Sequence, residues 1–123
     1  MKEITAYLSK DGVLFKDLKE CLEYEISLLI KNKRILFFSE GGYEIDTSGY
    51  NFNDLFNNCD FIKISGDAWS TVHRFCKEKG FVCPNCLNDS GIWKFDYITN
   101  KWVGIKAEII HTFENGYFLK EDY

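Results

Sequence analysis

The amino-acid sequence predicts an α+β fold, in which two helices pack on one face of an antiparallel sheet of about five to seven strands. Two segments carry apolar residues at helical spacing, and several short segments rich in β-branched and aromatic residues lie between turn sequences. Two helices on one antiparallel sheet is the simplest layered arrangement for this order of elements. The length of 123 residues predicts one domain, 1–123.

The chain is expected to begin with a short hairpin and a long helix. Residues 3–8 and 13–15 predict two strands around a turn sequence. Asp17 and Glu20 then have the spacing of a capping box, in which each side chain accepts a backbone N–H at the start of a helix. A stripe of leucine and cysteine residues at helical spacing extends that helix over residues 18–32.

A second hairpin is predicted directly after this helix. Residues 34–39 form an apolar strand, and Gly41 and Gly42 turn the chain into a partner segment over 43–46. Residues 54–58 are expected to form one helical turn.

The second helix follows a strand predicted over residues 61–65. Ser65 or Asp67 is expected to cap this helix, because both side chains accept hydrogen bonds from free backbone N–H groups. The helix is expected to end near Lys79, since Gly80 stands where a left-handed residue commonly stops a helix.

The remaining chain predicts strands joined by tight turns. Residues 92–97 and 101–106 are expected to pair around Thr99 and Asn100. The Asn-Gly sequence at 115–116 predicts a further hairpin, although a short helix over 107–112 is the competing interpretation.

The charge balance argues against a general nucleic-acid binder. Fifteen basic and nineteen acidic residues give a net charge of −4, whereas binding to many phosphates needs a basic face. The chain also has no apolar run long enough to span a membrane and no recognisable signal peptide. Five cysteines, an odd number, favour a reducing compartment. A cytoplasmic protein is therefore predicted.

Aromatic residues near the carboxyl end suggest a binding face. Trp93, Phe95 and Tyr97 alternate along one predicted strand, so their rings share a face, and Trp102 follows across the turn. The rings either cover the helices as part of the core or form a stacking surface for a flat ligand such as a nucleobase.

Polar residues that would complete such a ligand site are few. Asn100 and Lys101 lie at the turn beside the aromatic strand and can supply polar contacts. Arg34 and Arg74 are the only arginines, and arginine is well suited to binding phosphate. The predicted ligand site therefore contains seven residues: Trp93, Phe95, Trp102, Asn100, Lys101, Arg74 and Arg34.

A zinc site is the alternative interpretation of the cysteines. Cys83 and Cys86 flank a Pro-Asn turn in the manner of a zinc knuckle, and His73 and Cys76 lie three residues apart on the predicted second helix. These four residues have spacings that zinc accepts. If no zinc is bound, Cys76 is a small core residue of the helix, and no cofactor is expected.

Catalysis has little support in the sequence. There are two histidines, neither in a nucleophile motif, and the chain contains no P-loop and no metalloprotease motif. A non-enzymatic protein is therefore expected.

The first thirty residues resemble the opening of small bacteriophage proteins. The residues concerned are Ile4-Thr5-Ala6-Tyr7, Asp11-Gly12, Phe15, Glu20-Cys21 and Tyr24-Glu25. This strand, turn and helix are similar to the start of the Thoeris anti-defence sponge proteins. The resemblance implies a homo-oligomeric, non-enzymatic protein that binds a signalling nucleotide and withholds it from host immunity.

The leading functional hypothesis is sequestration of a small nucleotide-type immune signal by a phage-type protein in the host cytoplasm. Two alternatives remain at this point. The chain is a direct protein inhibitor of a host defence effector, or it is a zinc-stabilised interaction module.

Overall fold

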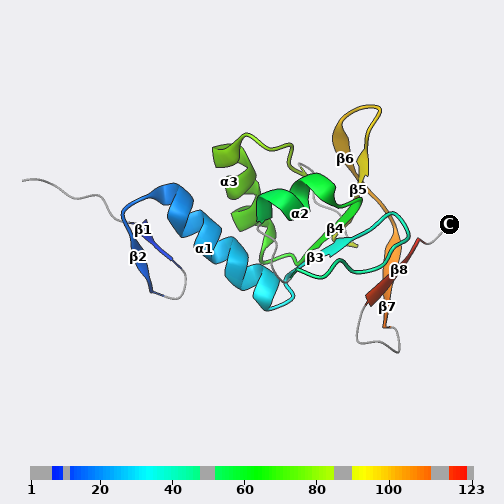
Figure 1. Cartoon of the computed structure of the whole chain (residues 1–123), viewed down its shortest axis with the longest axis horizontal. Coiled ribbons are helices and arrows are strands. Elements are labelled where there is room, and N and C mark those ends of the chain that lie inside the picture. The colour runs from blue at the N-terminus through cyan, green and yellow to red at the C-terminus, as the bar shows by residue number, and fades with distance from the viewer. Residues whose placement is uncertain (1–6, 10–11, 48–51, 85–89, 112–116, 122–123) are drawn as a thin grey trace, which may run out of the picture.

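The computed structural model describes residues 7–9, 12–47, 52–84, 90–111 and 117–121. It confirms the predicted α+β class: helices and antiparallel strands make up the described chain (Figure 1). The described strands form three sheets, of two, four and two strands.

The central sheet has four strands in the order β3-β4-β5-β6, and all neighbours are antiparallel. Its members are β3 (Ile35–Phe38), β4 (Phe61–Ile64), β5 (Ile92–Asp96) and β6 (Lys101–Gly104). The sheet has fewer strands than the predicted five to seven, because the first and last hairpins form small sheets of their own.

One face of the central sheet is covered by helices. These are α1 (Leu18–Lys31), α2 (Phe52–Asn58) and α3 (Trp69–Lys79), and α1 packs mainly against α3. Leu22 and Ile26 of α1, Val72 and Phe75 of α3 and Phe37 of β3 belong to the same buried cluster. The short α2 lies where one helical turn was predicted, so three helices cover this face in place of two.

The opposite face is covered by a hairpin of β7 (Ala107–His111) and β8 (Tyr117–Glu121). Leu119 of this hairpin packs with Leu36 and Phe38 in a second buried cluster. Every residue of β3 is buried as a result, which explains its continuous apolar run. The central sheet is therefore a middle layer, and the competing prediction of a helix over 107–112 is wrong.

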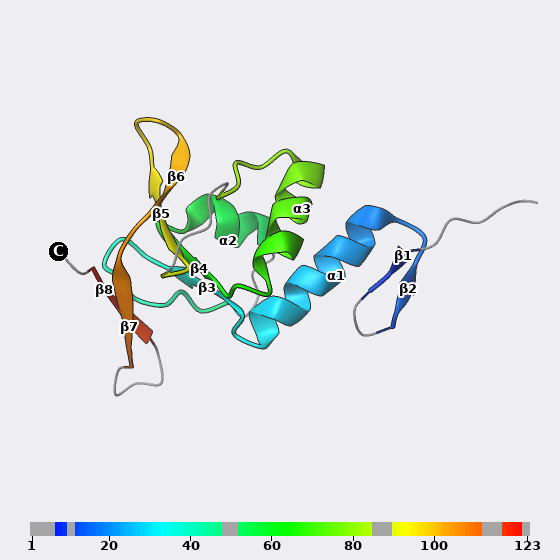
Figure 2. The ribbon, with the colours of Figure 1, turned by 180° about the vertical axis from the view of Figure 1, so that it is seen from behind.

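The first hairpin lies at the outer end of α1. Figure 2 shows β1 (Tyr7–Leu8) and β2 (Leu14–Phe15) at one end of the molecule and β7 and β8 at the other. The Phe15 ring lies 5.2 Å from the Tyr24 ring of α1, centroid to centroid. The Asp17 side chain caps α1 as predicted, accepting the Lys19 N–H at 2.9 Å.

The start of α3 differs from the prediction, whereas its end agrees. Ala68 occupies the capping position without a side-chain hydrogen bond, and the Asp67 carboxylate forms an ion pair with Arg34 instead. The expected cap by Ser65 or Asp67 is therefore wrong. Gly80 ends the helix in the left-handed conformation at φ 75°, as predicted.

The segment after β3 connects the central sheet to the last hairpin. Gly41 and Gly42 form the predicted turn, but the returning chain makes only one bridge with β3, between Phe38 and Glu44. The same segment pairs with β8: the Glu44 N–H donates to Tyr117 O at 2.9 Å, and the Leu119 N–H donates to Gly42 O. The C-terminal hairpin is thereby held against the sheet.

Replacing Gly42 tests this connection. Gly42 has a φ of +82°, and an added Cβ would lie 2.5 Å from the Leu119 carbonyl oxygen. Gly42→Ala is expected to lower the free energy of unfolding by about 3 kcal/mol, because backbone strain and a backbone clash combine. Gly80→Ala is the matched control: its φ is +75°, but no atom lies within 4 Å of the added Cβ.

Gly80→Ala is expected to lower the free energy of unfolding by about 1 kcal/mol, because it adds backbone strain alone. Urea denaturation measures both variants. Equal losses would contradict the close approach of the Leu119 carbonyl to Gly42.

Candidate functional site

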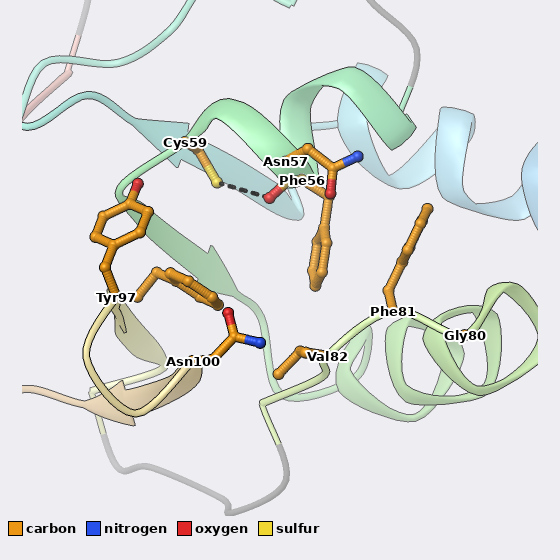
Figure 3. Close-up of a pocket in the computed structure, with 9 residues that line it drawn as sticks. Phe56, Asn57, Cys59, Gly80, Phe81, Val82, Tyr97 and Asn100 are labelled. Atoms are coloured by element: carbon orange, nitrogen blue, oxygen red, sulfur yellow. Dashed lines mark hydrogen bonds between the residues drawn. The ribbon is translucent and has the colours of Figure 1, made fainter.

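Two adjoining hollows lie between the carboxyl end of α3 and the β5–β6 hairpin. The first hollow, about 280 Å³, is lined by Phe56, Asn57, Cys59, Gly80, Phe81, Val82, Phe95, Tyr97 and Asn100 (Figure 3). The second hollow, about 540 Å³, is lined by His73, Lys77, Phe81, Val82, Cys83, Asn100, Lys101 and Trp102. The hollows adjoin, since both include Phe81, Val82 and Asn100.

The shared wall between the hollows is fixed by the end of α3. Gly80 turns the chain, and the Phe81 N–H donates back to Cys76 O of the helix at 2.9 Å. The Trp102 indole Nε1–H of β6 then donates to Val82 O at 3.1 Å. These contacts hold residues 81 and 82 between α3 and β6.

The other wall is the turn between β5 and β6. The Asp96 carboxylate accepts the Ile98 N–H and the Thr99 hydroxyl, both at 2.9 Å. These two hydrogen bonds, led by the backbone one, hold the Asp96 pKa below its usual range. Asn100 completes the turn with a φ of 57°, a left-handed conformation that asparagine tolerates. The turn thus presents Asn100 to both hollows.

The first hollow is dominated by aromatic rings. Phe56 and Phe81 stack with ring centroids 5.4 Å apart and planes at 20°. The Phe95 and Tyr97 rings meet edge to face at 5.0 Å, and the Tyr97 hydroxyl donates to the Asp60 carboxylate at 3.0 Å. Figure 3 shows Tyr97 and Phe81 on opposite sides of the hollow, with the Asn100 amide between them.

The second hollow contains cationic groups. Lys77 of α3 and Lys101 of β6 both line it, and within the described part of the chain neither lysine forms an ion pair. His73 lines the same hollow one helical turn before Lys77, and its ring stacks on Trp69 at 5.1 Å. This hollow is therefore locally positive on a chain whose net charge is −4.

A pair of thiols lies at the edge of the second hollow. Cys76 is buried in α3, whereas Cys83 is half-buried and lines the hollow. The Cys83 thiol donates to Pro84 O at 3.5 Å. The influence of the Cys76 side chain lowers the pKa of Cys83, and the influence of Cys83, together with burial, raises the pKa of Cys76. The acidic partner of the pair is therefore the one that faces the hollow.

The predicted zinc set is only partly described. Among the described residues, no group of three or more His, Cys, Asp or Glu side chains is arranged to hold a metal ion. Cys86, the fourth predicted ligand, lies outside the described residues. The zinc site therefore stays a prediction.

Four of the seven predicted ligand residues line the hollows. Phe95 lines the first, Lys101 and Trp102 line the second, and Asn100 lines both. Trp93 does not: its side chain is 2% exposed and belongs to the core beneath the helices. The proposed stacking role of Trp93 is therefore wrong. The core interpretation holds for Trp93 and also for Trp102, which is 7% exposed and belongs to the same buried cluster.

Both arginines lie away from the hollows. Arg34 precedes β3 and pairs with Asp67, and Arg74 is exposed on α3 but is part of neither lining. Lys77 takes the position on α3 that was expected of Arg74. His73 and Lys77 are four residues apart on α3. This spacing places both side chains on one face of the helix, and it is the sequence signal that could have identified Lys77.

Phe56 and Phe81 were not anticipated by sequence reasoning. They belong to α2 and to the segment after α3, which meet the β5–β6 hairpin only through the tertiary fold.

A comparison with protein-family models, with curated proteins and with solved structures found no match to this chain. The described residues also include no helix with the length and apolarity needed to cross a bilayer. The candidate site therefore rests on its own geometry.

Replacing Trp102 tests the hydrogen bond that positions the hollows. Trp102→Phe keeps an aromatic ring but removes the N–H that donates to Val82 O. Trp69→Phe is the matched control, because the buried Trp69 Nε1 has no hydrogen-bond partner among the described residues. Trp102→Phe is expected to lower the free energy of unfolding by about 1 kcal/mol more than Trp69→Phe does. Urea denaturation measures both variants. Equal costs for the two variants would contradict a structural role of this bond.

The buried Cys59 thiol predicts a loss of stability in alkali. Burial raises its pKa from 9.0 to about 12 in the folded chain. Above pH 9 the unfolded chain loses this proton while the folded chain keeps it, so the free energy of unfolding falls as pH rises. The expected contribution is about 1.4 kcal/mol per pH unit between pH 9 and pH 12. Cys59→Ala is expected to reduce the measured slope by this amount in urea denaturation, and an unchanged slope would contradict the burial of the thiol.

Proposed function

We propose that this chain is a non-enzymatic binding protein whose two hollows take one small nucleotide-type ligand. The observation that carries the proposal is the junction of an aromatic hollow with a cationic one. The two share Phe81, Val82 and Asn100, so one ligand can occupy both.

The first hollow suits a flat ring. Phe81 and Tyr97 face it from two sides, and an aromatic base gains about 1–3 kcal/mol from stacking on such a ring. The Asn100 amide has donors and an acceptor at the junction, which is the chemistry that recognises the edge of a base.

The second hollow suits the phosphate end of the same ligand. Lys77 and Lys101 reach it from α3 and β6, and each offers an ammonium group to a phosphate oxygen. Because the whole chain is acidic, this local charge favours one compact anion over a long polyanion. The two hollows, about 280 and 540 Å³, fall together within the size range of small-molecule sites.

Sequestration is the role we propose for this binding. A nucleotide-type immune signal held without turnover is withheld from its receptor. The resemblance of the first thirty residues to anti-defence sponge proteins supports this role, and the predicted homo-oligomer and host cytoplasm belong to the same hypothesis.

Calorimetric titration with ADP, GDP and NAD⁺ tests the proposed function. At least one of these probes is expected to bind, and Lys77→Met and Lys101→Met are each expected to weaken it about tenfold, since each removes one charge-assisted contact. Lys106→Met is the matched control, because Lys106 is exposed and lines neither hollow. Absence of heat with all three probes, or equal weakening by the control, would contradict binding in the hollows.

A direct protein inhibitor is the second candidate, because one apolar surface favours it. Ile98 is 95% exposed at the tip of the β5–β6 hairpin, and Tyr97 and Val103 are exposed beside it. Apolar side chains grouped at a surface commonly mark a protein contact. Retention of a host protein by the wild-type chain and its loss with Ile98→Asp would support this candidate.

A further inference from the structure

We propose that the outer edge of β6 pairs with β6 of a second copy of this chain, in antiparallel orientation about a two-fold axis. The inference gives an interface to the homo-oligomer of the proposed function, but it does not rest on nucleotide binding. It rests on backbone groups that β6 turns away from the central sheet and on the side chains beside them.

The hydrogen bonds between β5 and β6 identify the residues that face inward. The Ile105 N–H donates to Ile92 O at 3.0 Å, which makes these residues a hydrogen-bonded pair of the antiparallel ladder. Such pairs alternate with non-hydrogen-bonded pairs, so Lys94 and Val103 form the next hydrogen-bonded pair in the register. The backbone groups of Val103 are therefore used within the central sheet.

The residues on either side of Val103 have the opposite orientation. Trp102 lies opposite Phe95, whose N–H donates to Asp60 O on the far side of β5 at 3.0 Å. The N–H and C=O groups of Trp102 and Gly104 therefore point away from β5. β6 ends the strand order of its sheet, and no strand formed by the described residues pairs with this edge.

Unpaired backbone groups at a sheet edge determine the kind of occupant. They bind another extended strand, because only an extended backbone presents donors and acceptors at the same spacing. The β5–β6 hairpin projects from the rest of the ribbon in both views, which leaves room for such a strand (Figures 1 and 2).

One register pairs all the outward groups of two β6 strands. In this register Trp102 of each copy lies opposite Gly104 of the other, and the two residues exchange both N–H···O bonds, which gives four backbone hydrogen bonds. A shift by two residues in one direction places Gly104 opposite Asn100, whose left-handed φ of 57° does not suit a strand. A shift in the other direction places Trp102 opposite Lys106, which lies outside β6.

The side chains of β6 fit the same register. Val103 lies on the two-fold axis opposite its own copy, and its side chain is 47% exposed in the single chain. The Cα atoms of such a non-hydrogen-bonded pair are about 4.5 Å apart, so the two valine side chains meet. Gly104 brings no side chain against the Trp102 ring, and Lys101 lies opposite Ile105, so no like charges face each other. The edge is therefore self-complementary, as a two-fold interface requires.

Sedimentation equilibrium of the full chain tests the proposal. The wild type is expected to form a dimer of twice the 14.4 kDa of one chain, with a Kd below about 100 μM. Gly104→Pro is expected to be monomeric, because proline lacks the outward N–H but leaves the hydrogen bonds between β5 and β6 in place. Gly104→Ala is the matched control and is expected to dimerise, since alanine keeps the N–H. Circular dichroism confirms that each variant is folded.

Variants of Val103 test the register without a change to the backbone. Val103→Lys is expected to weaken the dimer about tenfold, because two like charges then meet on the two-fold axis. Leu14→Lys is the matched control: Leu14 is 69% exposed, and it lies in the first hairpin at the other end of the molecule. Val103→Cys is expected to give a disulfide-linked dimer under mild oxidation, in which peptide mapping finds the two introduced thiols joined to each other.

Three results would overturn the proposal. They are a wild type that stays monomeric at about 300 μM, a dimer that Leu14→Lys disrupts and Gly104→Pro does not, and a monomer whose β6 edge binds a strand of another protein. The proposed function fails separately. A monomeric chain that binds one of the three nucleotide probes would overturn only the self-pairing of β6, whereas a dimer that binds none of them would contradict only the proposed function.

Discussion

The hydrogen bond from the Trp102 indole to the Val82 carbonyl is the interaction on which the candidate site depends. It joins β6 to the segment that leaves α3, two parts of the chain about twenty residues apart. Together with the Phe81 N–H bond to Cys76 O and the stacking of Phe81 on Phe56, it fixes residues 81 and 82 between the two hollows. The Trp102 indole N–H thus helps to set the geometry of the candidate site.

Both faces of the central sheet are covered by other elements. Its helix-covered face and its hairpin-covered face are both buried, and all of β3 lies in the core. At the end of the sheet, where the β5–β6 hairpin extends past α2 and α3, side chains of several elements surround the two hollows. Lys77 and Lys101 line the second hollow on a chain whose net charge is −4, and the proposed preference for a compact anion depends on this local charge.

Sequence reasoning succeeded where local chemistry decides the structure. The Asp17 cap and the Gly80 stop depend on nearby backbone groups, and both were predicted. It failed where the burial or the partner of a residue depends on segments that are distant in the sequence. Alternation along β5 correctly placed Trp93 and Phe95 on one face, but only the tertiary fold decides that helices bury Trp93 while Phe95 reaches a hollow. The pairing of Arg34 with Asp67 is likewise a contact between distant segments, and no spacing rule indicates it.

Native mass spectrometry of the freshly purified protein, followed by denaturation in the same instrument, tests the central claim most directly. The account predicts a chain that carries an additional mass in the range of a nucleotide or, after incubation with a nucleotide mixture, acquires one. Denaturation is expected to release this molecule chemically intact, as binding without turnover requires. A chain that stays bare after both purification and incubation would contradict the account, and a ligand released in altered form would contradict its non-enzymatic part.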